Sequence, residues 1–410
     1  MSGAPAGSQR EQVARGALDD VRVLEVGDAS GEYAGRLLAG FGADVVRVEP
    51  PGGAASRRVG PYAGDVRHPD RSLHFWHYNV GKRSAVIDLE RDDGRALLVR
   101  LARHFDVVLA AGAYADLARW GVSDGTRLRA AHAATIVCTL TPFGLDGPWR
   151  DRPATDLTLM ALGGTMAVSG YGPEDPPLTC AGWQAYQTAS VYAVHGLLAA
   201  LLVRDATGEG QDVEVSAHEA ATSITEWHVP QVLFTGQVSR RAVLGLQFPA
   251  RDGVWVSAIV PEFFGPHVLP RLAELTGDAA LADPALATPE ARPRLQARIA
   301  EALARFCAAN DADTVYRAGQ RAGFPWAPIR TPDEPLDDAH LHDRGFWVPV
   351  AHEDLGRDLL YAGAPFVAEK MAWRFARRPP RLGEHTVEVL VEAGIGAADV
   401  ASLRAAGAVA

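Results

Sequence analysis

VRVLEVGDASGEYAGRLLAGFGADVVRV, residues 21–48, has the pattern of a strand, a helix and a second strand. Apolar residues alternate in Val21–Val26, as they do in a strand, and Ala43–Val48 is a second apolar run. A Gly-containing stretch that ends at Gly42 lies between them. We expect it to form a helix. The segment therefore predicts a right-handed β-α-β unit with parallel strands.

The same alternation of elements continues along the chain. Strand-like runs lie at Ala85–Leu89, Asp106–Ala110 and Ala134–Leu140, and a helical pattern covers Asp93–His104. We therefore expect the first 150 residues to form a parallel α/β domain. Small and aliphatic residues recur on all sides of 185–203, which predicts a buried helix. A turn at 207–211 leads from it into the alternating strand at 212–216.

The length of 410 residues predicts two or three domains. Residues 1–20 mix polar and small residues and are expected to be a mobile tail, and 21–228 the first part of a large domain. The composition shifts near Val229, and 229–325 is expected to be a smaller α+β domain with a strand at Gly253–Val260. The chain becomes Pro-rich after Trp326. We expect residues 326–410 to be a linker that returns to the large domain.

Charge, hydropathy and cysteine content exclude several classes of protein. Forty Lys and Arg against fifty Asp and Glu leave a net charge of −10, so no positive field attracts nucleic acid. The longest apolar stretch, Val191–Val203, has 13 residues, whereas a bilayer span needs about 20. We therefore expect no membrane span. The three cysteines form no CxxC pair, which fits a reducing cytoplasm. The first residues lack the apolar core of a signal peptide.

Nucleotide and metal motifs are absent from the sequence. Gly27, Gly31 and Gly35 are spaced G-x3-G-x3-G, not as the compact G-x-G-x-x-G of dinucleotide-binding folds. Glu49 ends the second strand, where such folds place an acid that binds ribose. We nevertheless expect no NAD site, because the compact glycine turn is missing. The 13 histidines include no H-x-x-x-H pair, so we expect no metal site.

One compact cluster of polar residues precedes the strand at 85–89. It contains Asn79, Gly81, Lys82 and Arg83, with two adjacent cations in an acidic chain. Such a loop can bind a phosphate group, although a loop of this composition is more often simply solvated. Arg119 lies near the end of a short helical segment, where a cation also interacts favourably with the helix dipole.

Several segments together resemble the family III CoA-transferases, the CaiB/BaiF-like group that includes formyl-CoA transferase, carnitine CoA-transferase and α-methylacyl-CoA racemase. In chain order they are VRVLEV (21–26), GADVVRVEPPG (42–52), NVGKRS (79–84), FGLDGP (143–148), LAAL (198–201), TGEGQ (207–211), GAPF (363–366) and LGEHT (382–386). The resemblance implies a Rossmann-like large domain built from both ends of the chain, a smaller α+β domain and a dimer of interlocked rings. It also implies coenzyme A as the phosphorylated ligand, with Lys82 and Arg83 along its nucleotide and Arg119 on a phosphate.

The sequence departs from this family at the catalytic positions. The family's Asp nucleophile corresponds to Tyr186, and no Asp or Glu lies between Asp175 and Asp205. The acid/base His of the racemase would precede Asp156, where Thr155 stands. Glu262, in the segment 261–264, resembles the racemase's Glu.

Glu32 and Tyr186 are our candidates for a relocated acid/base pair that faces the CoA thioester. Glu32 follows Gly31, where the family usually has Gly-Pro. In the alternative interpretation, Glu32 only caps its helix and Tyr186 only fills the space of the lost Asp. Asp156 and Glu262 are our further candidates for catalytic residues.

The resemblance predicts an enzyme that transfers CoA between carboxylic acids, with acyl-CoA and a carboxylic acid as substrates and with neither a metal nor NAD. Two alternatives stay open. One is a divergent isomerase or racemase, lyase or cyclase that moves protons on a CoA thioester. The other is a non-catalytic CoA-binding subunit. The family implies a homodimer, and the missing Asp also allows a heterodimer with a paralogue that retains it.

Overall fold

The computed structural model describes residues 15–239, 241, 247–260, 266–288 and 291–409. The chain divides into two compact units, one formed by residues up to 241 together with residues from 343 onward, and one formed by 242–342. Residues 229–241, expected in the smaller domain, lie in the first unit. Residues 326–342 stay in the second because Trp326 is buried in its core and β9 (Ala327–Pro328) pairs with β8 (Trp255–Ser257).

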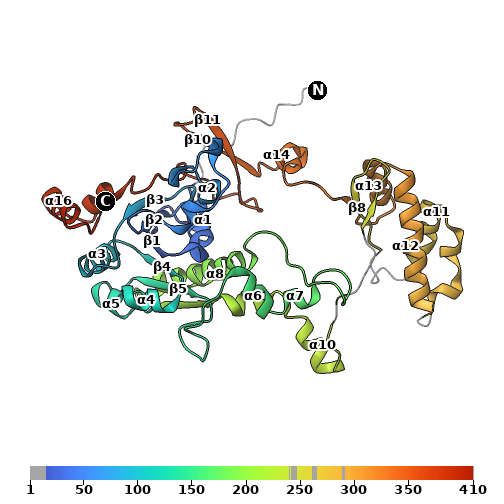
Figure 1. The fold of residues 1–410 in the computed structure, drawn as a ribbon, viewed down its shortest axis with the longest axis horizontal. Helices are drawn as coiled ribbons and strands as arrows, with labels where there is room; N and C mark the ends of the chain where they lie inside the picture. The colour runs from blue at the N-terminus through green and yellow to red at the C-terminus, as the bar shows by residue number, and fades with distance from the viewer. Residues whose placement is uncertain (1–14, 240, 242–246, 261–265, 289–290, 410) are drawn as a thin grey trace, which may run out of the picture. The chain divides into compact units, whose positions relative to one another are not determined.

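The first unit contains a six-stranded sheet in the order β3-β2-β1-β4-β5-β6, and every strand pair in it is parallel (Figure 1). The predicted parallel α/β architecture is confirmed. The strand order reverses direction between β1 and β4, as in doubly wound folds. The strands are β1 (Arg22–Gly27), β2 (Asp44–Glu49), β3 (Arg83–Val86), β4 (Val107–Ala111), β5 (Ile136–Thr141) and β6 (Asp212–Ser216).

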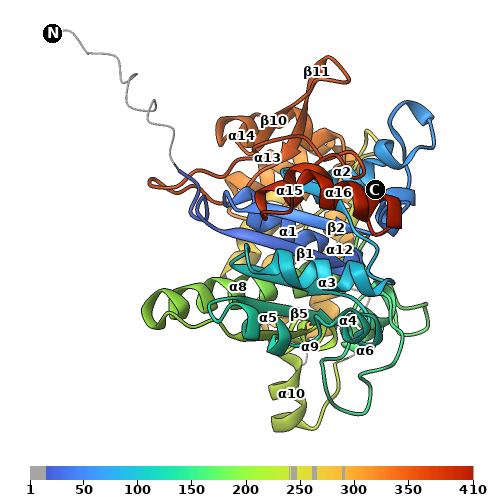
Figure 2. The ribbon, with the colours of Figure 1, turned by 90° about the vertical axis from the view of Figure 1, so that its left-hand side faces the viewer.

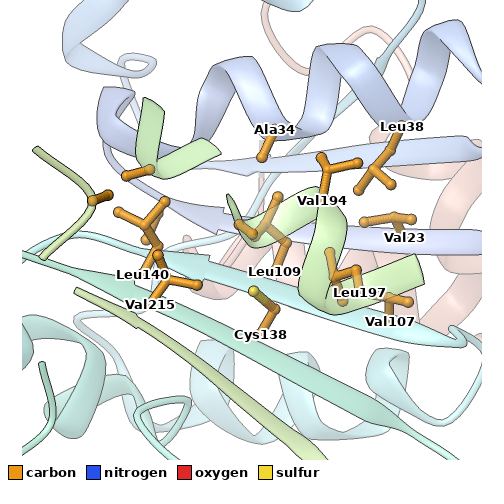
Figure 3. Close-up of a cluster of buried hydrophobic side chains, with 14 of the residues drawn as sticks. Val23, Ala34, Leu38, Val107, Leu109, Cys138, Leu140, Val194, Leu197 and Val215 are labelled. Atoms are coloured by element: carbon orange, nitrogen blue, oxygen red, sulfur yellow. The ribbon is translucent and has the colours of Figure 1, made fainter. Parts of the chain in front are cut away.

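Both faces of this sheet are covered. Successive residues of a strand alternate between two apolar clusters: Val107 and Leu109 of β4 belong to one, and Val108 to the other. The first cluster joins the sheet to α1 (Glu32–Gly40), α6 (Asp156–Leu162), α8 (Gln184–Thr207) and α9 (Ala217–Ser223). Figure 3 shows Ala34 and Leu38 of α1 and Val194 and Leu197 of α8 among the side chains of this cluster. Burial on both faces explains the nearly continuous apolar strands.

The other face is covered by helices from both ends of the sequence. The second cluster includes residues of α3 (Asp92–Ala102), α15 (Thr386–Glu392) and α16 (Ala397–Ala406). Figure 2 shows α15 and α16, in red, alongside the blue and cyan elements of the N-terminal part. α15 contacts β3, and Arg83 Nη1 lies 2.9 Å from Glu388 Oε1. The C-terminal segment therefore completes the first unit.

The remaining elements of the first unit are short. The hairpin β10–β11 (Trp347–His352 and Arg357–Ala362) is antiparallel. The other helices are α2 (Leu73–Asn79), α4 (Tyr114–Trp120), α5 (Thr126–Ala131), α7 (Thr165–Val168) and α10 (His228–Thr235). α14 (Ala339–Asp343) lies where the chain re-enters this unit.

The second unit combines three short antiparallel strands with helices. Its sheet has the order β7-β8-β9, with β7 at Gln247–Pro249. Its helices are α11 (Leu269–Thr276), α12 (Arg292–Ala309) and α13 (Ala312–Arg321). Trp326 is fully buried at the centre of the apolar cluster that these elements share.

α8 is long and apolar enough to cross a bilayer by length and composition alone. We expected no such helix. Its buried residues, among them Ala189, Ala193 and Leu197, pack in the cluster on the sheet, as those of a core helix do. Cys138, Cys180 and Cys307 are all free thiols.

Candidate active site

A cavity of about 150 Å³ lies at the carboxyl ends of the parallel strands. Four of its lining residues follow four strands: Asp28 comes directly after β1, Ala113 shortly after β4, Pro142 directly after β5 and Ala217 directly after β6. Doubly wound sheets bind ligands at this edge, where the strand order reverses. The other lining residues are Ser30, Leu140, Arg152, Pro153, Ala154 and Tyr186.

Asp28 is the one acid among the residues that line this cavity. Its Oδ1 accepts hydrogen bonds from the Ser30 backbone N (2.9 Å) and the Ser30 Oγ (2.5 Å). Its Oδ2 accepts no hydrogen bond from the residues that the structure describes. Gly112 follows β4 with φ +138°, and a Cβ there would lie 3.2 Å from Oδ2, so a glycine keeps this oxygen uncrowded. The residue is exposed, but the surrounding protein desolvates the carboxyl and raises its pKa.

Tyr186 lies in the first turn of α8, and Asp156 fixes that turn. The backbone N of Tyr186 donates a 3.0 Å hydrogen bond to Asp156 Oδ1, and this carboxylate also accepts from Gln184 and Ala185. An acid at a helix N-terminus satisfies donors that have no partner within the helix. Burial, with the charges of Asp28 and Asp156, raises the pKa of Tyr186 to about 12. The phenol therefore stays protonated at neutral pH and can donate a hydrogen bond.

Arg152 is the one basic residue among those that line the cavity. Its Cζ lies 4.8 Å from the centre of the Trp149 ring, which packs against the guanidinium. It makes no ion pair with any carboxylate in the described part of the chain. A guanidinium in this state can bind a substrate carboxylate with two parallel hydrogen bonds.

Glu32 lies in a different environment from Tyr186. It is fully buried at the start of α1, where Oε1 is 2.7 Å from Arg47 Nη2 and accepts from Ser56 Oγ at 2.6 Å. Asn79 Nδ2 donates to Oε2 at 3.1 Å. Glu32 does not line the cavity. The hypothesis of a Glu32–Tyr186 acid/base pair therefore finds no support in this geometry. The Glu32 carboxylate makes no cap hydrogen bond to α1 either.

Lys82 belongs to the same buried cluster. Its Nζ lies 2.7 Å from Glu25 Oε2 and donates to the Glu32 backbone O (2.8 Å) and to Asn79 Oδ1 (3.0 Å). These three oxygens match the three donors of an ammonium group. A phosphate would have to displace one of them. Gly81 precedes it with φ +84°, a backbone conformation that only glycine adopts easily.

The other expected phosphate contacts are also paired with acids. Arg83 is buried and binds Asp44, Glu388 and Glu392. Arg119 is half-exposed, with Nη2 2.8 Å from both Glu90 Oε1 and Asp116 Oδ1. Neither residue lines the cavity, and their contact with CoA stays a prediction. Glu262 lies outside the described residues.

The described residues offer few side chains that could bind a ribose or a metal ion. Glu49, the acid considered for a ribose, is fully buried, and both of its oxygens accept 2.7 Å hydrogen bonds from Arg57. In the parts of the chain that the structure describes, no group of three or more His, Cys, Asp or Glu side chains could hold a metal ion.

Residues 18–386 match the protein family described as CoA-transferase family III. The chain belongs to this family. The family that the sequence motifs indicated is thus confirmed, and with it an enzyme of the CoA-transferase type, whose substrates are CoA thioesters and carboxylic acids.

Relatives within the family are similar over nearly their whole length. The chain is 32% identical over 408 residues to the succinyl-CoA:(R)-benzylsuccinate CoA-transferase subunit BbsE of Thauera aromatica, covering 95% of this chain and 97% of that one. It is 32% identical over 402 residues to the succinyl-CoA–D-citramalate CoA-transferase of Chloroflexus aurantiacus, with the same coverage. The crystal structure of a CaiB/BaiF family protein from Brucella suis superposes with a TM-score of 0.80 at 25% identity, over 92% of this chain and 100% of that one.

Sequence reasoning missed the two charged residues that line the cavity, Asp28 and Arg152. The signal for Asp28 was present, because an acid that directly follows the first strand of a doubly wound sheet lies at its ligand-binding edge. Arg152 lies in the loop after β5, outside the segments that resemble the family. Of the expected catalytic residues that the structure describes, Tyr186 lines the cavity and Glu32 does not, and Asp156 contacts the backbone of Tyr186.

Proposed function

We propose that this enzyme transfers CoA from succinyl-CoA to a second dicarboxylic acid. The observation that carries the proposal is Arg152, an exposed residue that lines the same cavity as Asp28 and has no ion-pair partner in the described residues. A dicarboxylic acid keeps one free carboxylate when the other is joined to CoA. That free carboxylate needs a positive partner, and Arg152 is the cation available in the cavity.

The names of the relatives support this choice of substrate. Relatives are named for succinyl-CoA or succinate as one substrate and for benzylsuccinate, citramalate or glutarate as the other. Each of these acids has two carboxylates. A cavity that holds one guanidinium suits the whole set, because the free carboxylate is the group that the acids share.

The experiment is an exchange assay with the purified protein. Succinyl-CoA is mixed with single acids, and thioesters and free acids are quantified by mass spectrometry. We expect equal amounts of succinate and of the new thioester when the acceptor is a dicarboxylic acid. The matched controls are monocarboxylic acids of the same chain length, butyrate against succinate and valerate against glutarate, which we expect to react poorly because they leave Arg152 unpaired.

Two results would contradict the proposal. Conversion of the thioester without any acceptor would indicate an isomerase, lyase or cyclase. CoA binding without turnover would indicate a non-catalytic subunit, the second candidate. That candidate is favoured by Tyr186 at the expected nucleophile position and by relatives named as subunits of larger transferases.

We also propose that the chain works as a dimer, either of two copies arranged as interlocked rings or with a paralogue. Support comes from α10, where Leu233 and Phe234 are 75% and 89% exposed, because large exposed apolar side chains are typical of surfaces that another chain covers. Light scattering of the purified protein measures the mass of the assembly. A monomeric mass at enzyme concentrations that sustain exchange would contradict the dimer.

A further inference from the structure

The cavity is lined by one carboxylate, that of Asp28, and by the hydroxyl residues Ser30 and Tyr186. The Ser30 hydroxyl already donates a hydrogen bond to Asp28 Oδ1. Of the ten residues that line it, Asp28 is the only acid. Tyr186 stands where the family resemblance expects the nucleophilic Asp, and its hydroxyl is a poor substitute for a carboxylate. The question is therefore which carboxylate can reach a thioester bound at this edge of the sheet.

The other carboxylates near this edge are already committed to protein contacts. Both oxygens of Glu32 have partners within 3.1 Å, and the side chain has no exposed surface. Asp156 accepts hydrogen bonds from the first turn of α8. Asp28 differs from both, because its residue is exposed and its Oδ2 accepts no hydrogen bond from the described residues.

The turn that carries Asp28 is attached to α8 close to Tyr186. Ser190 Oγ donates a 3.3 Å hydrogen bond to the backbone O of Ser30, and Ser190 is fully buried. Positions 186 and 190 are one helical turn apart and therefore share a face of α8. Ser30 in turn holds Oδ1 of Asp28 through its N and Oγ. A chain of hydrogen bonds thus sets Asp28 beside the position of Tyr186.

We propose that Asp28 is the nucleophile of this enzyme, so that the catalytic carboxylate has moved from the first turn of α8 to the turn after β1. The proposal rests on the CoA transfer proposed above and names the residue that carries it out. Ser30 orients one oxygen of the carboxylate, and the other is left to attack.

The chemical steps balance without any further reactant. Oδ2 of Asp28 attacks the carbonyl carbon of succinyl-CoA and the C–S bond breaks. This step forms a mixed anhydride of Asp28 and succinate and releases CoA as a thiolate. The thiolate then attacks the Asp28 carbonyl carbon and the anhydride C–O bond breaks. This step forms an aspartyl-CoA thioester and releases succinate. The acceptor carboxylate attacks this thioester, and the same two steps in reverse give the new thioester and the free Asp28. The Tyr186 hydroxyl, protonated in this cavity, can donate a hydrogen bond to the oxyanion formed in each step.

The test traps the intermediate on the protein. Wild-type enzyme, in the oligomer that it forms, is incubated with succinyl-CoA alone and treated with hydroxylamine or borohydride, and its peptides are mapped by mass spectrometry. Hydroxylamine converts an activated aspartyl group to a hydroxamate, and borohydride reduces the thioester to an alcohol. We expect both modifications at Asp28. Modification at another acid, or at none, would overturn the proposal.

Two variants provide a second readout. Asp28→Asn and Asp28→Ala are expected to slow exchange by roughly 10³-fold or more, the scale on which removal of a nucleophile acts, and to lose the adduct. The matched control is Asp399→Asn, an exposed acid in the first turn of α16 on the other side of the sheet, which should keep both. CoA titration and urea unfolding report whether each variant is folded.

These readouts separate the two proposals. Normal exchange by Asp28→Asn would overturn the role of Asp28 and leave CoA transfer standing. An adduct on Asp28 without exchange to any dicarboxylic acid would support Asp28 and overturn the proposed acceptor class. Absence of both the adduct and the exchange would overturn both proposals.

Discussion

The buried charged cluster beneath α1 and the cavity beside it use the same kinds of side chain in opposite ways. In the cluster, the carboxylates of Glu25 and Glu32 lie against Arg47 and Lys82, and all four side chains are buried. In the cavity, the carboxylate of Asp28 and the guanidinium of Arg152 have no ion-pair partner among the described residues. Charges in the cluster are satisfied by protein, and those in the cavity are left for a ligand.

The pKa values of two acids show the same contrast. Burial raises the pKa of Asp28, because the hydrogen bonds from Ser30 and the charge of Arg47 offset it only in part. Burial alone would also raise the pKa of Glu49, but hydrogen bonds and charge from Arg57 outweigh it, and that pKa is lowered. An acid with a full set of partners keeps its charge to lower pH, whereas a desolvated acid with few partners is protonated at higher pH.

The largest effect on stability is expected from a substitution inside the buried charged cluster. Lys82→Met removes the ammonium that lies 2.7 Å from Glu25 and leaves a fully buried carboxylate short of a partner. Breaking a buried ion pair in this way destabilises a protein by about 3–5 kcal/mol. We expect urea denaturation to show a loss of this size. A variant as stable as the wild type would mean that Lys82 is not needed to compensate Glu25.

In the cavity, the effect of losing a cation should be on substrate binding rather than on folding. Arg152→Met is expected to raise the KM for dicarboxylic acids by about 10- to 100-fold. This increase corresponds to the loss of about 1.5–3 kcal/mol that a charged hydrogen bond contributes. Arg150→Met is the matched control, because Arg150 packs on Tyr114 and pairs with Asp151. Equal KM values for both variants and the wild type would show that Arg152 does not bind the substrate carboxylate.

As the pH falls, we expect the cavity to lose its activity before the buried acid Glu49 loses its stabilising effect on the fold. Asp28, whose pKa is raised, is protonated first as the pH falls, so we expect exchange to decline while the protein is still folded. Glu49, whose pKa is lowered, stabilises the fold above its unfolded pKa of about 4.3 and loses this effect only at lower pH. The charged and titratable groups that act on Asp28 are Glu32, Arg47 and Tyr186, with Arg152 in the cavity.

The measurement is the rate of exchange and the circular dichroism signal over the same pH series. We expect a range of pH in which exchange has declined but the circular dichroism signal is unchanged. Coincident loss of activity and of structure would contradict it. In Asp28→Asn, the structural transition should stay where it is in the wild type.

The smallest effect on stability is expected at the surface. Arg119→Ala removes two half-exposed ion pairs, with Glu90 and Asp116, and pairs of this kind add little to stability. We expect no measurable shift in the urea midpoint. CoA titration of the same variant tests the phosphate contact that the family resemblance implies: an unchanged affinity would exclude Arg119 from the CoA site.

Most strands of the large sheet could be predicted because they are buried on both faces and therefore read as apolar runs. β6, with Asp212 and Glu214 exposed, is predicted instead from its alternation. The roles of Lys82 and Arg83 could not be predicted locally. The acids that pair with Arg83 include Glu388, 305 residues away, and no pattern within the segment 79–84 indicates them. The smaller unit extends beyond residue 325 because Trp326 is buried in its core and β9 pairs with β8, about 70 residues earlier, and the Pro-rich composition after Trp326 indicates neither contact.

The discontinuous first unit has a consequence for the order of events during synthesis. The second unit comprises residues 242–342 and has all of its residues before the chain is finished. The first unit still lacks α15 and α16 at that moment, so β3 and the side chain of Arg83 have no helix packed against them from this end until residues 386–406 have been synthesised. Because domains fold as units and N-terminal ones usually fold first, this chain reverses the usual order: its inserted unit can be complete while its N-terminal unit is still open to water.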